Sequence, residues 1–227
     1  MKTRSTKLRF FQLMWQQIPG SLKQISVGSA SQIWGVNATD DIYRYLGDNK
    51  WQQVKGKLKY VSVAADGTIF GVNAKDEIYQ VVGNNEWQQI PGSLKQISVG
   101  SGLQIWGVNA TDDIYRYLGD NKWQQVKGKL KHVSVAADGT IFGVNAKDEI
   151  YQFVGNNEWK QIPGSLKQIS VGSASQIGGV NAIDDIYRYL GDNKWQQVKG
   201  KLKHVSVAAD CTIFGVNAKD EIYQYVG

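Results

Sequence analysis

One pattern opened by tryptophan returns every 36 residues and limits what this chain can fold into. Each copy begins W-x-Q-[IV]-x-G-x-L-K-x-[IV]-S-V and continues with G-V-N-A and D-x-I-Y. The six copies begin at Trp15, Trp51, Trp87, Trp123, Trp159 and Trp195. A fixed period of about 20 to 50 residues indicates a repeat architecture, in which each repeat is one unit stacked on its neighbours.

The copies are of two alternating types, so the longer period is 72 residues. The first two 72-residue units, 15–86 and 87–158, differ only at Ala30/Gly102, Ser31/Leu103, Tyr60/His132 and Val81/Phe153. The third unit carries Gly178 where the others have tryptophan, Ile183 where they have threonine, and Cys211 where they have glycine. Near-identity suggests recent duplication or deliberate construction, and the sequence leaves both open.

Each repeat contains four short runs of strand-forming residues separated by turn residues. Runs such as LKQISVG, QIWGVNA, DIYRYL and KWQQV alternate with clusters of Gly, Asn, Asp and Ser, and no run has a useful helical period. Four antiparallel strands per repeat make one propeller blade. The sequence therefore predicts an all-β fold, a six-bladed β-propeller of six 36-residue repeats in three near-identical 72-residue units.

Local features of the repeat also predict details of the blade. The glycine of W-G-V-N fits a bulge or a close backbone approach. The asparagine that follows can close a turn through its side chain. Cys211 replaces a turn glycine, and we interpret it as a drifted turn residue rather than a reactive thiol.

The two ends of the repeat array predict how the ring closes. If LKQISVG is the innermost strand, the last blade ends at DEIYQYVG without an outer strand. The segment Met14 to Ile18 would supply it. We therefore expect a basic tail at 1–11 and one propeller at 12–227, with its N-terminal strand closing the last blade.

Charge and composition exclude several classes of protein. The net charge of +6 owes most to the first eleven residues, which hold four basic residues and no acidic one. The repeats have no basic run, so nucleic-acid binding is not expected. No apolar run approaches the ~18 residues of a membrane span, so no membrane insertion is expected either. One cysteine and no convincing signal peptide favour a cytoplasmic location, with secretion left open.

The recurring W-x-x-[IV]-x-G-x-L-K-x-[IV], [WF]-G-V-N and D-x-I-Y, at 36-residue spacing over residues 12–227, resemble the tectonin repeat family. That family includes fish-egg lectins, the lipopolysaccharide-binding tachylectin of horseshoe crabs, and fungal and slime-mould tectonins. The resemblance implies a six-bladed propeller that binds glycans, often on microbial surfaces and sometimes with methylated sugars. Animal members are secreted and usually carry disulfides, which a chain with one cysteine cannot form internally.

Aromatic residues are the first candidates for sugar binding. The tryptophans that open the repeats would pack the outer strand of each blade or offer a platform for a pyranose. In the third unit Gly178 occupies the position of Trp34 and Trp106, so that position is partly open or the ring is stable enough to tolerate the loss of an indole. Inter-blade packing is the simpler reading of Trp34 and Trp106, and a sugar contact is the alternative.

Acidic pairs recur at the start of each third run. They are Asp40/Asp41, Asp112/Asp113 and Asp184/Asp185 in the first repeat type, and Asp76/Glu77 with its copies in the second. Capping of local N–H groups in a turn explains them, and acceptance of sugar hydroxyls is the alternative. Two carboxylates could suggest a glycosidase, but adjacent residues of a strand point to opposite faces, and six near-equal copies favour binding over catalysis.

Basic residues complete the set of candidates. Arg44, Arg116 and Arg188 occur only in the first repeat type and are either solvated charges or contacts to glycan carboxylate or phosphate. His132 and His204 replace Tyr60 without a cluster of metal ligands around them. No metal site and no cofactor are expected.

Together these observations favour a monomeric, non-enzymatic, multivalent lectin that binds glycans or glycoconjugates, with bacterial lipopolysaccharide or O-methylated sugars as candidate partners. Repetition would raise its avidity by ~10²–10⁴. The expected site is formed by Trp34, Asp40, Asp41, Arg44, Trp106, Asp112, Asp113, Arg116, Asp184, Asp185 and Arg188. The alternative is a protein-interaction scaffold or a constructed symmetric propeller without an evolved ligand.

Overall fold

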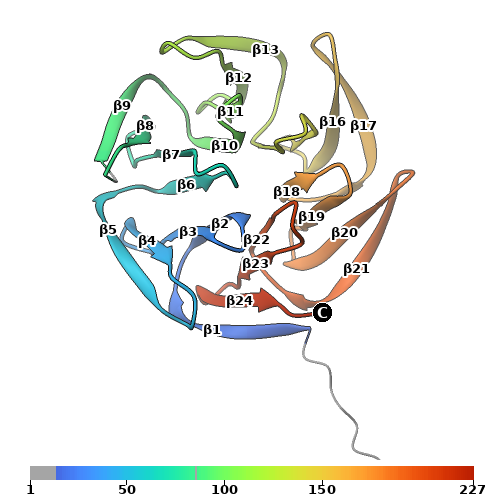
Figure 1. Ribbon diagram of the computed structural model, residues 1–227. Helices are drawn as coiled ribbons and strands as arrows, with labels where there is room; N and C mark the ends of the chain where they lie inside the picture. Colours follow the sequence, from blue (N-terminus) through green and yellow to red (C-terminus); the bar gives the residue numbers. More distant parts are fainter. Residues whose placement is uncertain (1–13, 85) are drawn as a thin grey trace, which may run out of the picture.

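The computed structural model describes residues 14–84 and 86–227, so the basic tail expected at 1–11 lies outside the described residues. The described chain forms six four-stranded antiparallel sheets arranged as blades around one axis (Figure 1). No helix is present in these two ranges. The six-bladed all-β propeller predicted from the repeats is confirmed.

Blades run from the centre outward in the order of the chain. The first blade consists of β2 (Gln24–Ser29), β3 (Gln32–Val36), β4 (Asp41–Tyr45) and β5 (Trp51–Lys57). The second consists of β6 (Tyr60–Val63), β7 (Ile69–Val72), β8 (Glu77–Val82) and β9 (Glu86–Ser93). The third consists of β10 (Gln96–Ser101), β11 (Gln104–Val108), β12 (Asp113–Tyr117) and β13 (Trp123–Lys129). The fourth blade consists of β14 (His132–Val135), β15 (Ile141–Val144), β16 (Glu149–Gly155) and β17 (Glu158–Ser165). The fifth consists of β18 (Gln168–Ser173), β19 (Gln176–Val180), β20 (Asp185–Gly191) and β21 (Lys194–Lys201).

The last blade takes strands from both ends of the chain. It consists of β22 (His204–Val207), β23 (Ile213–Val216), β24 (Glu221–Tyr225) and β1 (Trp15–Ser21). Figure 1 shows β1 beside β24 at the rim. Trp15 pairs with Tyr225 and Ile18 with Ile222, which is the closure expected from the ends of the repeats.

Serine side chains join the innermost strands of successive blades. Ser26 Oγ accepts a hydrogen bond from the Val63 N–H at 3.0 Å, and the same bond recurs around the ring. It ends with Ser206 Oγ accepting from the Val27 N–H at 2.8 Å, which links the last blade to the first. These serines are buried, so each bond satisfies a backbone donor that water cannot reach.

The glycine of W-G-V-N is required by a close approach. A Cβ on Gly35 would lie 2.5 Å from Leu22 Cδ1 and 2.8 Å from the Gln24 carbonyl oxygen. Gly35 pairs in regular register with Ile25 and Tyr43, so there is no bulge there. Of the two explanations that the sequence allowed for this glycine, the structure supports close packing against the leucine of L-K.

Candidate functional site

The N-A-[TKI]-D turns between the second and third strands lie on one face of the propeller, together with the loops that lead into each next blade. Asn37 Oδ1 accepts hydrogen bonds from the backbone N–H groups of Thr39 at 3.0 Å and Asp41 at 2.8 Å. Asp40 adopts a positive φ of 65°. The asparagine therefore closes the turn as predicted. The sequence also predicted that the aspartates cap backbone N–H groups, but the carboxylates of Asp40 and Asp41 accept hydrogen bonds from side chains instead.

The first aspartate of each pair is held by a lysine of the same repeat. Asp40 Oδ1 accepts a hydrogen bond from Lys23 Nζ. The equivalent pairs are Lys59–Asp76, Lys95–Asp112, Lys131–Asp148, Lys167–Asp184 and Lys203–Asp220. The lysine of L-K thus neutralises the carboxylate that follows the turn, in all six repeats.

The second aspartate faces a different set of partners. Asp41 lies 2.7 Å from Lys57 Nζ and accepts hydrogen bonds from Thr39 Oγ1 at 2.8 Å and Asn37 Nδ2 at 3.2 Å. The Lys57 ammonium, with the Thr39 hydroxyl and the Asn37 amide, holds the pKa of Asp41 at about 2. Asp113 has the same partners and the same low pKa, and Lys201 lowers the pKa of Asp185. These carboxylates stay ionised at neutral pH, which suits hydrogen-bond acceptance and excludes them as general acids there.

The indoles of Trp34 and Trp106 belong to the core, which corrects their assignment to a sugar site. They are 1 % and 3 % exposed and pack edge-on against Trp87 and Trp159 of the next blade. A buried ring has no free face on which a pyranose can stack. Because both faces of a blade are covered by its neighbours, a tryptophan in the second strand is enclosed from either side.

The three arginines lie on the third strands, at the outer part of their blades. Arg44 Nη2 donates to Gln52 Oε1 at 3.4 Å and Arg116 Nε donates to Gln124 Oε1 at 2.8 Å. Arg44 is directly opposite the buried Trp34 in the strand pairing. The arginines and the aspartates are therefore not brought together into one cluster with Trp34 and Trp106.

A pocket between neighbouring blades recurs on the face that carries the turns. At the first interface its volume is about 220 Å³, and at two further interfaces it is about 230 and 280 Å³. Every copy combines an outer-strand edge of one blade with an aromatic pair and an asparagine of the next. The first is lined by Ile42, Gly56, Lys57, Leu58, Asn73, Tyr79 and Trp87.

The aromatic wall of this pocket is fixed by the bulge in the outer strand. Trp87 Nε1 donates to the Lys55 carbonyl oxygen at 3.0 Å. Gly56, at φ of 121°, lets the indole approach, because a Cβ there would lie 3.3 Å from Trp87 Cδ1. Tyr79 Oη donates to Glu77 Oε2 at 3.1 Å. The pocket thus presents a half-buried indole and phenol beside charged and amide groups.

The same contacts recur at the interface between the fourth blade (β14 to β17) and the fifth (β18 to β21). Trp195 Nε1 donates to the Pro163 carbonyl oxygen at 2.9 Å, and its pocket has Ser165 in place of Lys57. The sequence reasoning included the tryptophans of these walls but missed Tyr79 and Asn73. Their signal was present in the repeated D-x-I-Y and G-V-N, yet the pocket forms between two successive blades, and the sequence of one repeat does not show which strands face each other there.

A narrow polar cavity of about 40 Å³ lies on the axis of the ring. Tyr60 Oη lies 3.1 Å from His132 Nε2 and 3.4 Å from His204 Nε2. Burial, with neighbouring positive charge, lowers the pKa of both imidazoles to about 3, and burial raises that of Tyr60. Among the described residues, no three His, Cys, Asp or Glu side chains are grouped as a metal site.

None of the described segments is a helix with the length and apolarity needed to cross a membrane. The family model of the Tectonin domain matches residues 1–92, 32–120 and 93–227. The chain belongs to the tectonin family. This confirms the resemblance seen in the repeats, and it covers the whole propeller. A comparison with curated proteins gives no match to this tectonin.

Solved structures resemble the tectonin in fold. A streptogramin B lyase is 12 % identical with a TM-score of 0.64, over 92 % of this chain and 96 % of that one. YCF48 bound to D1 peptide is 13 % identical with a TM-score of 0.64, over 91 % and 78 %. A luciferin-regenerating enzyme is 9 % identical with a TM-score of 0.69, over 94 % and 95 %. At these identities the likeness concerns the propeller alone.

Proposed function

We propose that this tectonin is a multivalent lectin that binds glycans in the pockets between its blades. The observation that carries the proposal is the recurring pocket itself. Each copy offers an indole and a phenol beside lysine or serine and asparagine, in 220 to 280 Å³. Aromatic faces suit the C–H face of a pyranose, and the polar rim suits its hydroxyls.

Several shallow sites on one face would act together on a glycan-covered surface. A single open pocket binds a sugar weakly, because each hydrogen bond to the sugar replaces a hydrogen bond to water. Once one site is occupied, the others bind as intramolecular events, which raises avidity by ~10²–10⁴. Microbial surface glycans, including lipopolysaccharide and O-methylated sugars, present the repeated ligands that such a ring requires.

Binding without catalysis fits the same residues. Catalysis by two carboxylates needs one asymmetric site whose environments separate two pKa values. Here the acidic groups recur in equivalent surroundings; the aspartates pair with lysines, and Glu77 accepts hydrogen bonds from Asn73 and Tyr79. Related folds include enzymes and a peptide-bound propeller, so the second candidate function is a protein-interaction scaffold, favoured by the peptide complex of YCF48.

The decisive experiment is a glycan array carrying bacterial lipopolysaccharides and O-methylated sugars, with free sugar as competitor. Three proteins are compared. They are the unmodified chain, a pocket variant Lys57→Ala/Lys129→Ala, and an outer-strand variant Arg44→Gln/Arg116→Gln/Arg188→Gln. The lysine side chains are about 60 % exposed, so their truncation leaves the core intact.

We expect competable binding that the pocket variant weakens at least ten-fold and the outer-strand variant retains. Loss confined to the outer-strand variant would keep the lectin and move its sites to the arginines. Absence of binding to every glycan on the array would reject the lectin. Binding to a protein partner that persists after the partner is deglycosylated would establish the scaffold instead.

A further inference from the structure

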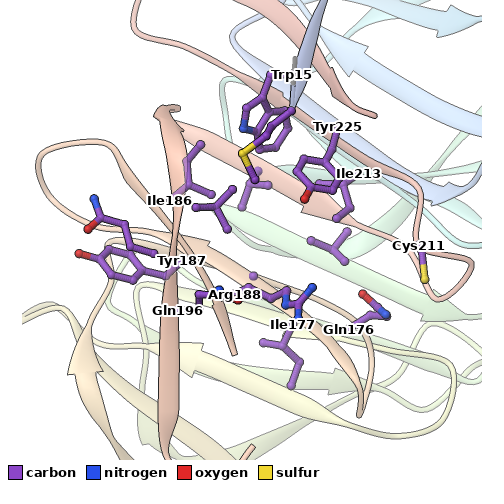
Figure 2. A pocket seen from close by; sticks show the side chains of 16 residues that line it. Trp15, Gln176, Ile177, Ile186, Tyr187, Arg188, Gln196, Cys211, Ile213 and Tyr225 are labelled. Atoms are coloured by element: carbon purple, nitrogen blue, oxygen red, sulfur yellow. The ribbon is translucent and has the colours of Figure 1, made fainter. Parts of the chain in front are cut away.

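A cavity lies where the third unit lacks a tryptophan. Its volume is about 400 Å³, and it lies between the fifth and the last blade. Figure 2 shows Trp15, Tyr225 and Ile213 of the last blade across from Ile177, Arg188 and Gln196 of the fifth. Gln176 and Cys211, at the inner hairpin turns, form the end of this cavity on the face opposite the N-A-[TKI]-D turns, and Trp15 and Ile186, the counterparts of Trp87 and Ile42, line it as well.

The walls of the cavity are those that enclose an indole in the other two units. At the equivalent positions the indoles of Trp34 and Trp106 occupy this space and are buried. With glycine at 178, Val198 and Ile213 become partly exposed, although their counterparts Val54 and Ile69 are buried. The backbone is unchanged, because Gly178 pairs with Ser170 and Arg188 as Trp34 pairs with Ser26 and Arg44. The third unit therefore keeps the shape of the indole site and opens it.

One charged side chain lines this cavity. Arg188 is opposite Gly178 in the strand pairing and is exposed. Among the described residues it makes no hydrogen bond or ion pair, whereas Arg44 and Arg116 each donate to a glutamine. The lining contains no aspartate or glutamate, and Gln176, Gln196 and Gln197 add neutral polar groups.

We propose that the cavity at Gly178 binds a flat, indole-sized aromatic small molecule that carries a carboxylate. The aromatic part takes the place of the missing indole between Ile177, Val207 and Ile213. The carboxylate faces the Arg188 guanidinium, which can donate two hydrogen bonds to it. An apolar cavity of ~150 Å³ is enough to hold benzene, so the volume here suffices for a bicyclic ring with a short acidic side chain.

The site does not depend on glycan binding and occurs once in the ring. Its test uses indole-3-propionate as the anionic probe and 3-methylindole as the neutral one, with binding measured by titration calorimetry on the full chain. Gly178→Trp restores the residue of the two other units. A Cβ at 178 would lie 3.2 Å from Val207 Cγ2, so Val207 needs to move only slightly.

We expect one molecule of indole-3-propionate per chain, a loss of at least ~100-fold in affinity in Gly178→Trp, and a higher Tm for that variant because the void is filled. Arg188→Gln should weaken the anionic probe roughly ten-fold and leave the neutral probe unchanged. Arg116→Gln is the matched control and should change neither.

Binding that Gly178→Trp leaves unchanged would overturn the site. Equal affinity for the two probes, insensitive to Arg188→Gln, would overturn the preference for a carboxylate. Absence of binding for both probes, with the Tm of Gly178→Trp raised, would reject the ligand site and leave only an empty packing defect.

Discussion

At the scale of residues, the third unit departs from the others at a threonine that supports a carboxylate. Thr39 Oγ1 donates to Asp41 at 2.8 Å, and Ile183 occupies the equivalent position with 68 % of its surface exposed. We expect Ile183→Thr to lower the pKa of Asp185 toward that of Asp41, because the hydroxyl stabilises the ionised form. Carboxyl carbon NMR against pH measures the shift.

The reverse change, Thr39→Ile, is the control and should raise the pKa of Asp41. Both substitutions lie on the surface, so stability should change by no more than about 0.5 kcal/mol. An Asp185 pKa that stays fixed in Ile183→Thr would show that Lys201, Asn181 and Gln197 set it without a hydroxyl.

Residues that act within one blade were predictable from the sequence, and residues that act between blades were not. Asn37 closes its turn and Gly35 allows a close approach, since each depends on neighbours a few positions away. Trp34 is buried between two blades, which agrees with inter-blade packing as the simpler reading of the sequence and excludes the alternative sugar contact. Tyr79 and Trp87 line a pocket with Gly56 of the preceding blade, and that pairing depends on the radial arrangement.

At the scale of elements, the bulge in each outer strand positions the tryptophan of the next blade. We expect Gly56→Ala to destabilise the protein by about 1–2 kcal/mol, because the added Cβ forces a non-glycine residue to keep φ near 121° and crowds Trp87. Equilibrium urea unfolding measures the loss. Gly83→Ala is the matched control, since a Cβ there meets nothing within 4 Å.

Gly83→Ala should leave the unfolding midpoint nearly unchanged, and Gly56→Ala should also weaken any glycan bound in the first pocket. Equal midpoints for the two variants would show that the outer strand relaxes around the new methyl group. The bulge would then not be needed to hold Trp87 against the neighbouring blade.

At the scale of the whole molecule, the axis of the ring carries two histidines that resist protonation. The pKa of His132 and His204 is about 3, below the ordinary value of about 6.5 that applies in the unfolded chain. The unfolded state therefore binds more protons as the pH falls. Stability from these groups is complete above pH 6.5 and is lost progressively down to pH 3, at a slope of up to about 1.4 kcal/mol per pH unit for each histidine.

Urea unfolding between pH 6 and 4.5 isolates this contribution when the unmodified chain is compared with a histidine variant, because both proteins carry the same carboxylates. We expect His132→Gln/His204→Gln to flatten the decline over that range, since glutamine can contact Tyr60 without titrating. The same slope in the variant and in the unmodified chain would place the acid sensitivity elsewhere.

Closure of the ring makes the junction of the last and first blades equivalent to the other five. The Val27 N–H donates to Ser206 Oγ at 2.8 Å, and the Val99 N–H donates to Ser62 Oγ at 2.9 Å. Ser206→Ala and Ser62→Ala each leave one buried donor unpaired, which costs about 1–3 kcal/mol. In a closed ring we expect the two costs to agree and the amides of Val27 and Val99 to exchange equally slowly. An open array would instead fray at its ends, so a smaller cost for Ser206→Ala with faster exchange at Val27 would show that β1 does not keep the ring closed in solution.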